Sequence, residues 1–276
     1  MNKCARLAMA LAVAAALLSA TGCQKLQARD RLTKGVHAYK AANYEKAIEY
    51  FKDAVRLDKD LRVAKLYLAT AYMQQYVPGV DTPENNANAQ MAIEEYQAVL
   101  GDDPSRQEKV TSLKGIASLY MNMKKFDQSA EYYKKAIEAD PSDPEAYYSV
   151  GVIDWTAVYK DISDRKSKLG LGVEGQLKSR EACEEIKAAD GPKIDEGLKM
   201  LQTAMDKRQD YDDAMTYTNL LYHRKADTEC GDPQGYANDI KAANDWSDKA
   251  MAARKKKFEE ANKKVQGGIT LDQPKK

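Results

Sequence analysis

The chain has 276 residues, among them only two histidines and four cysteines. Gly170, Gly172 and Gly175 match the G-x-G-x-x-G spacing, which lets a backbone approach a dinucleotide pyrophosphate where a strand joins a helix. Here a charged stretch at 160–168 with the pattern of a helix precedes the glycines, and no strand pattern surrounds them. We therefore interpret the motif as a flexible linker.

The two histidines, His37 and His223, lack the neighbours that catalysis needs. A catalytic histidine usually works with an orienting carboxylate and a nucleophile. His223 with Cys183 and Cys230 offers three potential zinc ligands, but without the tight spacing of zinc sites. The acidic run at 227–232 is too irregular for a calcium loop. We expect a protein that is not an enzyme and uses no metal or cofactor.

The charge balance argues against nucleic acid as a partner. The 43 Lys and Arg residues face 42 Asp and Glu residues, which leaves a net charge of +1. A phosphate backbone is held by a strong basic field, and this balance does not supply one. Charges of alternating sign follow the helix-like stretches, which is typical of solvated helical faces.

The first 22 residues have the composition of a secretory signal peptide. A basic start is followed by an apolar stretch at 7–18 and by small residues up to Cys23. The apolar stretch is too short to span a bilayer comfortably, and no other stretch approaches ~18 apolar residues. We predict export, with a signal peptide at 1–22 and an N-terminal tether at 23–27.

Residues 20–23, Ala-Thr-Gly-Cys, resemble the lipobox of bacterial lipoproteins. The resemblance implies cleavage before Cys23 and a lipid on its thiol, and two acyl chains suffice for stable anchoring. Ala20 departs from the usual Leu, Val or Ile, and ordinary cleavage at a small-x-small site is the alternative. The resemblance further implies a membrane-anchored protein of the cell envelope that faces the periplasm. Gln24 in place of Asp slightly favours the outer membrane under the family's sorting rule.

Two more cysteines, Cys183 and Cys230, lie in the rest of the chain. In an oxidising compartment a disulfide between them is the default interpretation, and buried free thiols are the alternative. The bond would tie the second of two insertions, described below, to the C-terminal region.

One helical pattern occurs three times, with a small residue, an aromatic residue four positions later and another small residue three positions after that. Its members are Ala47, Phe51 and Ala54; Ala92, Tyr96 and Val99; and Ser129, Tyr133 and Ala136. This spacing places the three residues on one helix face. A small residue lets a second helix come close, and the aromatic ring fills the gap beside it.

A partner helix precedes each of these segments, with equivalent small residues at Gly35, Ala69, Ala117 and Gly151. The combined pattern over 34 residues, with Pro stops such as Pro104 and Pro141, resembles the tetratricopeptide repeat. The resemblance implies an all-α solenoid of about four helix pairs and a partial fifth. Its units would be 28–61, 62–106, 110–143 and 144–211, followed by one helix at 212–225.

Two insertions interrupt the predicted array 28–225, at about 75–90 and 157–193. Insertions in repeat proteins usually form loops, often on the binding side, and the second insertion should hold a helix at about 177–189. Asp143 and Pro144 are a good N-cap and first residue for a helix. The region 226–265 should hold a capping helix over the last repeat, and 266–276 a disordered polar tail.

In the tetratricopeptide family the first helix of each unit lines a concave groove that contacts partner peptides. Carried over by position, the groove residues are Tyr39, Lys40, Leu66, Met73, Lys114, Met121, Asn122, Tyr148, Trp155 and Arg224. Met adapts to varied partners, and Trp and Tyr are frequent hot-spot residues. The resemblance implies a non-enzymatic scaffold that binds a protein or peptide. The alternative is an enzyme or small-ligand binder with a site formed by the two insertions.

Overall fold

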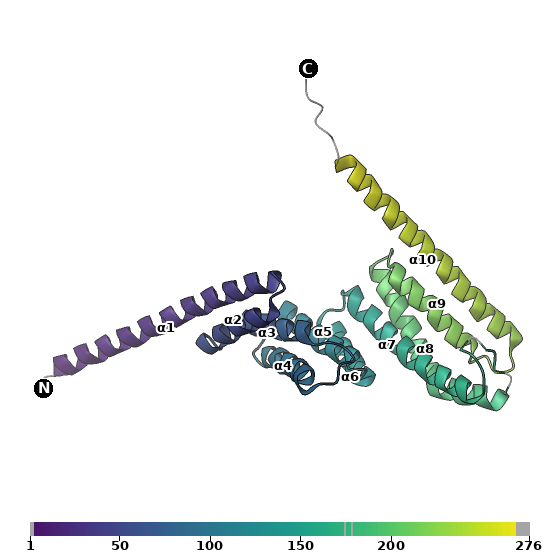
Figure 1. Cartoon of the computed structure of the whole chain (residues 1–276), viewed down its shortest axis with the longest axis horizontal. Helices are drawn as coiled ribbons and strands as arrows, with labels where there is room; N and C mark the ends of the chain where they lie inside the picture. Colours follow the sequence, from purple (N-terminus) through teal and green to yellow (C-terminus); the bar gives the residue numbers. More distant parts are fainter. Residues whose placement is uncertain (1–2, 174, 178, 269–276) are drawn as a thin grey trace, which may run out of the picture. The chain divides into compact units, whose positions relative to one another are not determined.

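The structure, a computed structural model, describes residues 3–268 apart from 174 and 178, and side chains at 22–263 with the same gaps. Over these residues the chain forms ten α-helices and no strand, so the all-α prediction is confirmed (Figure 1). It divides into two compact units, 1–139 and 140–276.

The first unit contains three pairs of sequential helices, each pair joined by a short connection. They are α1 (Lys3–Lys40) with α2 (Tyr44–Leu57), α3 (Arg62–Gln75) with α4 (Pro83–Leu100), and α5 (Arg106–Asn122) with α6 (Phe126–Ala139). The first helices of the pairs also neighbour one another, α1 next to α3 and α3 next to α5. This arrangement aligns one face of three helices.

Close packing of a glycine against an aromatic ring holds these pairs together. Phe51 is fully buried against Gly35, and a Cβ atom on Gly35 would overlap the ring. Tyr96 packs in the same way against Gly115, which joins the second pair to the third. The small residues and rings of the repeat pattern therefore meet across the helix interfaces, as the spacing predicts.

Polar side chains define the helix ends. Ser105 Oγ accepts a hydrogen bond from the Glu108 amide at 3.3 Å, and the Glu108 carboxylate accepts one from the Ser105 amide at 2.8 Å. This capping box starts α5. In the second unit Asp143 accepts from the Glu145 amide at 2.9 Å with Pro144 as the first helical residue, which confirms the predicted helix start.

The second unit consists of α7 (Pro144–Lys168), α8 (Arg180–Lys207), α9 (Asp212–Ala226) and α10 (Pro233–Gly268). α7 packs on α8, and α10 packs on α9. Asn219 on α9 donates to the Ala243 carbonyl on α10 at 2.7 Å, and Ala243 and Ala250 are buried at this contact. The described part of the predicted tail, 266–268, continues α10, and 269–276 lie outside the described residues.

Much of the second insertion is helical, and most of the helix expected at about 177–189 belongs to α8. α7 has 25 residues against the 17 of α5, and α8 has 28 and passes through Pro192 without a break. The continuous helix is supported because Ile186 and Ile194, on either side of the proline, are both buried in one core. The exposed Ala188, whose carbonyl loses its helical partner, can bond water instead.

The predicted signal peptide and the first repeat helix are continuous in the structure, since α1 runs from Lys3 to Lys40. Cys23 lies in this helix with an exposed side chain and no disulfide. Among the described residues, no helix combines the length and the apolar character needed to cross a membrane.

Candidate functional site

The first-helix face of the first unit, defined as the aligned side of α1, α3 and α5 that carries the predicted groove residues, is only partly covered. Tyr39, Leu66, Met73, Lys114 and Met121 are half-buried there. Lys40 and Asn122 are exposed. Apolar and charged side chains thus alternate on a surface that no other described part of the first unit covers completely.

Tyr39 is held in place by two other tyrosines. Its ring meets Tyr44 edge-on at 5.3 Å and Tyr67 at 6.5 Å between centroids. Burial, and then the neighbouring Tyr44, raise the pKa of the Tyr39 hydroxyl above its usual value. The hydroxyl therefore stays protonated at neutral pH and is able to donate a hydrogen bond to a partner.

A pocket of about 490 Å³ adjoins this face and is lined by the first insertion; we call it the edge pocket. Asn85 is buried and shapes its loop, because its amide nitrogen donates to the carbonyls of Val77 at 2.9 Å and Val80 at 2.6 Å. The lining residues are Tyr76, Gly79, Val80, Asp81, Asn86, Gln90, Asn122, Met123, Lys124 and Lys125. One predicted groove residue, Asn122, is therefore shared between the face and the pocket.

In the second unit, α7 and α9 are neighbours and carry a row of aromatic rings. Tyr148 meets Tyr217 at 5.7 Å, Trp155 meets Tyr217 at 5.2 Å, and Trp155 stacks on Tyr159 at 5.2 Å. Tyr148 also lies 4.9 Å from Tyr211, and its pKa is raised, first by burial and then by Tyr217. The predicted groove residues Tyr148 and Trp155 are half-buried, because part of each side chain packs against the neighbouring rings.

The prediction that Arg224 contacts a partner is wrong, because its side chain is buried inside the second unit. Arg224 donates to the Val173 carbonyl at 3.1 Å and lies 3.3 Å from the Asp227 carboxylate. Lys166 is buried beside it, 2.6 Å from Asp227, and donates to the same carbonyl at 2.8 Å. Sequence reasoning missed this cluster because Lys166 and Val173 belong to an insertion without a repeat pattern.

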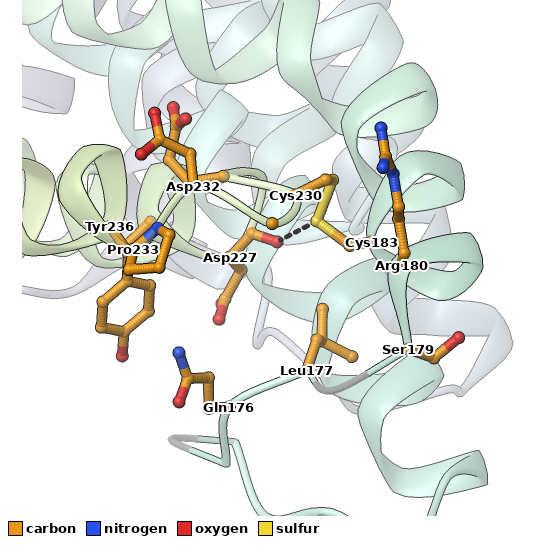
Figure 2. Close-up of a pocket in the computed structure, with 13 residues that line it drawn as sticks. Gln176, Leu177, Ser179, Arg180, Cys183, Asp227, Cys230, Asp232, Pro233 and Tyr236 are labelled. Carbon is orange, nitrogen blue, oxygen red and sulfur yellow. Dashed lines mark hydrogen bonds between the residues drawn. A yellow bond between two sulfur atoms is a disulfide. The ribbon is translucent and has the colours of Figure 1, made fainter.

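Cys183 on α8 and Cys230 in the α9–α10 turn are joined by a disulfide, with Cα atoms 5.5 Å apart. The bond borders a cavity of about 170 Å³, which we call the disulfide pocket. It is lined by Gln176, Leu177, Ser179, Arg180 and Cys183 and by residues between 226 and 236. Figure 2 shows the disulfide and Arg180 on one side of the pocket and Tyr236 on the other. With both thiols bonded, the zinc interpretation loses two of its three ligands.

No group of three or more His, Cys, Asp or Glu side chains among the described residues could hold a metal ion. The G-x-G-x-x-G glycines lie in the loop between α7 and α8, so two helices flank them. The pyrophosphate fingerprint requires a strand before the motif.

A pair of carboxyl groups lies between α7 and α8, where sequence reasoning gave no signal. Asp190 is buried and hydrogen-bonded to Asp161, which also binds Arg165 at 2.6 Å. Burial, and then the charge of Asp161, raise the pKa of Asp190 to about 7. One proton is therefore shared by the pair near neutral pH.

Comparison with known proteins identifies the repeats directly. A tetratricopeptide repeat model matches residues 110–143, the same range as the predicted third unit, and a second such model matches 35–61. The chain therefore contains tetratricopeptide repeats. The matched ranges lie in the first unit.

Similar proteins extend this picture to the fold. The chain is 30% identical over 70 residues to the photosystem I assembly protein Ycf3 of Prochlorococcus marinus. The aligned region is 25% of this chain and 40% of Ycf3. The chain thus spans well under half of this curated relative.

Solved structures of MamA resemble most of the chain. One crystal structure covers 82% of this chain and 96% of its own at a TM-score of 0.54 with 14% identity. MamA 41-end from Desulfovibrio magneticus RS-1 covers 83% and 96% at a TM-score of 0.55 with 14% identity. At such identities the likeness concerns the fold, and it confirms the predicted tetratricopeptide-type solenoid.

Proposed function

We propose that the protein is a non-enzymatic scaffold that binds a partner protein or peptide on its first-helix face. The observation that carries the proposal is the half-buried state of Leu66 and Met73 on α3 and of Met121 on the neighbouring α5, in an array of tetratricopeptide type. Adaptable Met side chains between Lys40 and Lys114 suit a peptide with apolar and acidic residues.

The edge pocket would anchor one end of such a peptide. Asn85 fixes the pocket loop through three hydrogen bonds to Val77 and Val80 backbone atoms, so the pocket is formed before binding. A preformed site lowers the entropy cost of association. Lys124 and Lys125 on its rim add positive charge at the same end.

A test compares two Met→Glu changes on the face with the same change elsewhere. The chain carrying Met73→Glu and Met121→Glu should lose the proteins that co-purify with the wild-type chain after crosslinking in its native cells. Met91→Glu on α4, where the side chain is 42% exposed, is the matched control and should retain them. Loss in both variants, or in neither, would contradict the proposal.

We further propose that the protein is exported and anchored by a lipid on Cys23, on the periplasmic side of the cell envelope and with the outer membrane slightly favoured. Support comes from the signal-like composition of 1–22, the lipobox-like residues 20–23 and the exposed Cys23 thiol. Mass spectrometry of the mature protein from membranes should find a diacylated Cys23 at the N-terminus. An unmodified N-terminus after ordinary cleavage would contradict it.

The relatives fit a scaffold role. Ycf3 is by name an assembly protein, and an analogous task for this chain would be assembly of other envelope proteins. The partner's identity would come from the crosslinking experiment.

A second candidate function is binding of a small ligand in the disulfide pocket. It is favoured because Gln176, Leu177 and Arg180 of the second insertion line a cavity of about 170 Å³ together with Asp227 and Tyr236. Each insertion lines a pocket within its own unit. Native mass spectrometry of protein purified from its own cells tests this function. A bound small molecule that is lost on Tyr236→Ala would support ligand binding. A mass equal to that of the chain alone would contradict it.

A further inference from the structure

The second half of α10 extends beyond the helix that supports the first half. Ala243 and Ala250 are buried on α9, and the last contacts are those of Arg254 and Lys257 with Asp212. Asp212 is the first residue of α9, so α10 has passed the end of α9 after Lys257 (Figure 1). Residues 254–263 are all exposed.

Two large apolar side chains of α10 are exposed to water, one just before this extension and one on it. Met251 is 58% exposed and Phe258 is 68% exposed. Residues seven apart lie on nearly the same side of a helix, so the two side chains form one stripe. Val265 continues the spacing in the sequence. An exposed apolar stripe on a helix indicates a surface that a membrane or another molecule covers.

Basic residues surround the stripe. Residues 249–264 contain seven cationic residues, Lys249, Arg254, Lys255, Lys256, Lys257, Lys263 and Lys264, and two acidic ones, Glu259 and Glu260. This local excess stands out in a chain whose net charge is +1. What covers the stripe must therefore be negatively charged as well as apolar.

The spacing disfavours a partner helix. A coiled-coil seam needs apolar residues at alternating steps of three and four. Arg254 and Lys255 occupy the positions three and four after Met251, and Ala261 and Asn262 those after Phe258. Only one of the two apolar positions in each heptad is therefore present. This disfavours a coiled coil with a second copy of this chain or with another helix.

An anionic bilayer surface matches the same features. Isolated bulky apolar side chains enter the boundary between headgroups and acyl chains, while flanking Lys and Arg side chains reach the phosphate groups. We propose that residues 251–268 bind the surface of an anionic phospholipid membrane. The inference goes beyond the scaffold function and does not depend on a lipid at Cys23.

Vesicle co-sedimentation tests the proposal with the full chain carrying Cys23→Ser, which excludes the lipid anchor. The chain should sediment with vesicles that contain phosphatidylglycerol and phosphatidylcholine, and not with phosphatidylcholine alone. Changing Lys255, Lys256, Lys263 and Lys264 to Gln should weaken binding roughly 600-fold, since each of the four basic residues near such a surface contributes about fivefold. Met251→Ala with Phe258→Ala should weaken it about tenfold.

A charge-matched control removes four exposed lysines elsewhere, with Lys59, Lys109, Lys187 and Lys199 changed to Gln. It has the same net charge and should bind vesicles like the Cys23→Ser chain. Hydrogen exchange adds a local readout, because amides at 251–268 should become protected only with anionic vesicles, whatever the N-terminal residues do.

Three results would overturn the proposal: no sedimentation with anionic vesicles, equal loss in the control, or no added protection at 251–268. A dimer that dissociates on Phe258→Ala, seen by light scattering, would also overturn it in favour of a second copy of the chain. Circular dichroism verifies that each variant retains its helices.

Discussion

Lys166 and Asp227 form a buried ion pair in the second unit, with Lys166 Nζ 2.6 Å from Asp227 Oδ1 and side chains 1% and 6% exposed. Together with Arg224 the pair holds the Val173 carbonyl, so it fixes the loop after α7 against the end of α9. The loop of the second insertion is therefore attached to the repeat array by charge as well as by the neighbouring disulfide.

Removing one member of this pair should destabilise the second unit strongly. Asp227→Ala leaves Lys166 and Arg224 buried together without their carboxylate, and we expect a loss of about 3–5 kcal/mol in unfolding free energy. Urea unfolding measures it. Asp245→Ala, which breaks the exposed Lys241–Asp245 pair, is the control and should leave the midpoint nearly unchanged. Equal effects would show that the buried pair is not stabilising.

The disulfide should stabilise the second unit selectively. It closes a sequence separation of 47 residues, and the double variant Cys183→Ser with Cys230→Ser should lose about 3–4 kcal/mol. Both tryptophans, Trp155 and Trp246, belong to the second unit, so their fluorescence follows its unfolding. An unchanged fluorescence midpoint in the variant, or under reducing conditions, would contradict this assignment.

The glycines that face rings should not tolerate a methyl group. Gly35→Ala and Gly115→Ala would overlap Phe51 and Tyr96, and each should cost about 1–3 kcal/mol in unfolding free energy. Gly101→Ala is the matched control, since its Cβ meets nothing closer than 3.7 Å and its φ of −79° suits alanine. Circular dichroism during urea unfolding separates the two cases, and a similar cost for all three would show that the ring contacts are not tight.

The carboxyl pair between α7 and α8 should make stability fall as the pH rises through neutrality. The pKa of Asp190 is about 7 in the folded chain, against an ordinary value of 3.8 for an aspartate. The folded state thus binds more protons between these values, so unfolding free energy decreases as pH rises from about 4 to 7. Asp190→Asn should flatten this part of the profile and stabilise the chain above pH 7. Asp195→Asn, at an exposed position, should leave the pH dependence of the unfolding free energy unchanged. The same pH dependence in Asp190→Asn would contradict the raised pKa of Asp190.

The repeat architecture could be predicted because its signal is local and geometric. Ala47, Phe51 and Ala54 share one helix face at a spacing that only helix packing explains, and Gly35 supplies the matching gap on the helix before. The helix start at Asp143 follows from equally local chemistry. Such features need no knowledge of distant contacts.

The insertions could not be predicted in the same way. α8 continues through Pro192, where Ile186 and Ile194 on either side of the proline share one core. The burial of Arg224 depends on Val173, 51 positions away. The Asp161–Asp190 pair likewise depends on how two long helices pass each other. These relationships are tertiary, and no periodicity in the sequence encodes them.

Photo-crosslinking tests the scaffold account most directly. A photoreactive amino acid is placed at Tyr39, Met73 or Met121 on the first-helix face, or at the control position Met91 on α4, and the cells are irradiated. The account predicts that the three face positions capture the same protein partner and that Met91 does not. Capture from Met91 alone, or no shared partner at the three face positions, would contradict it.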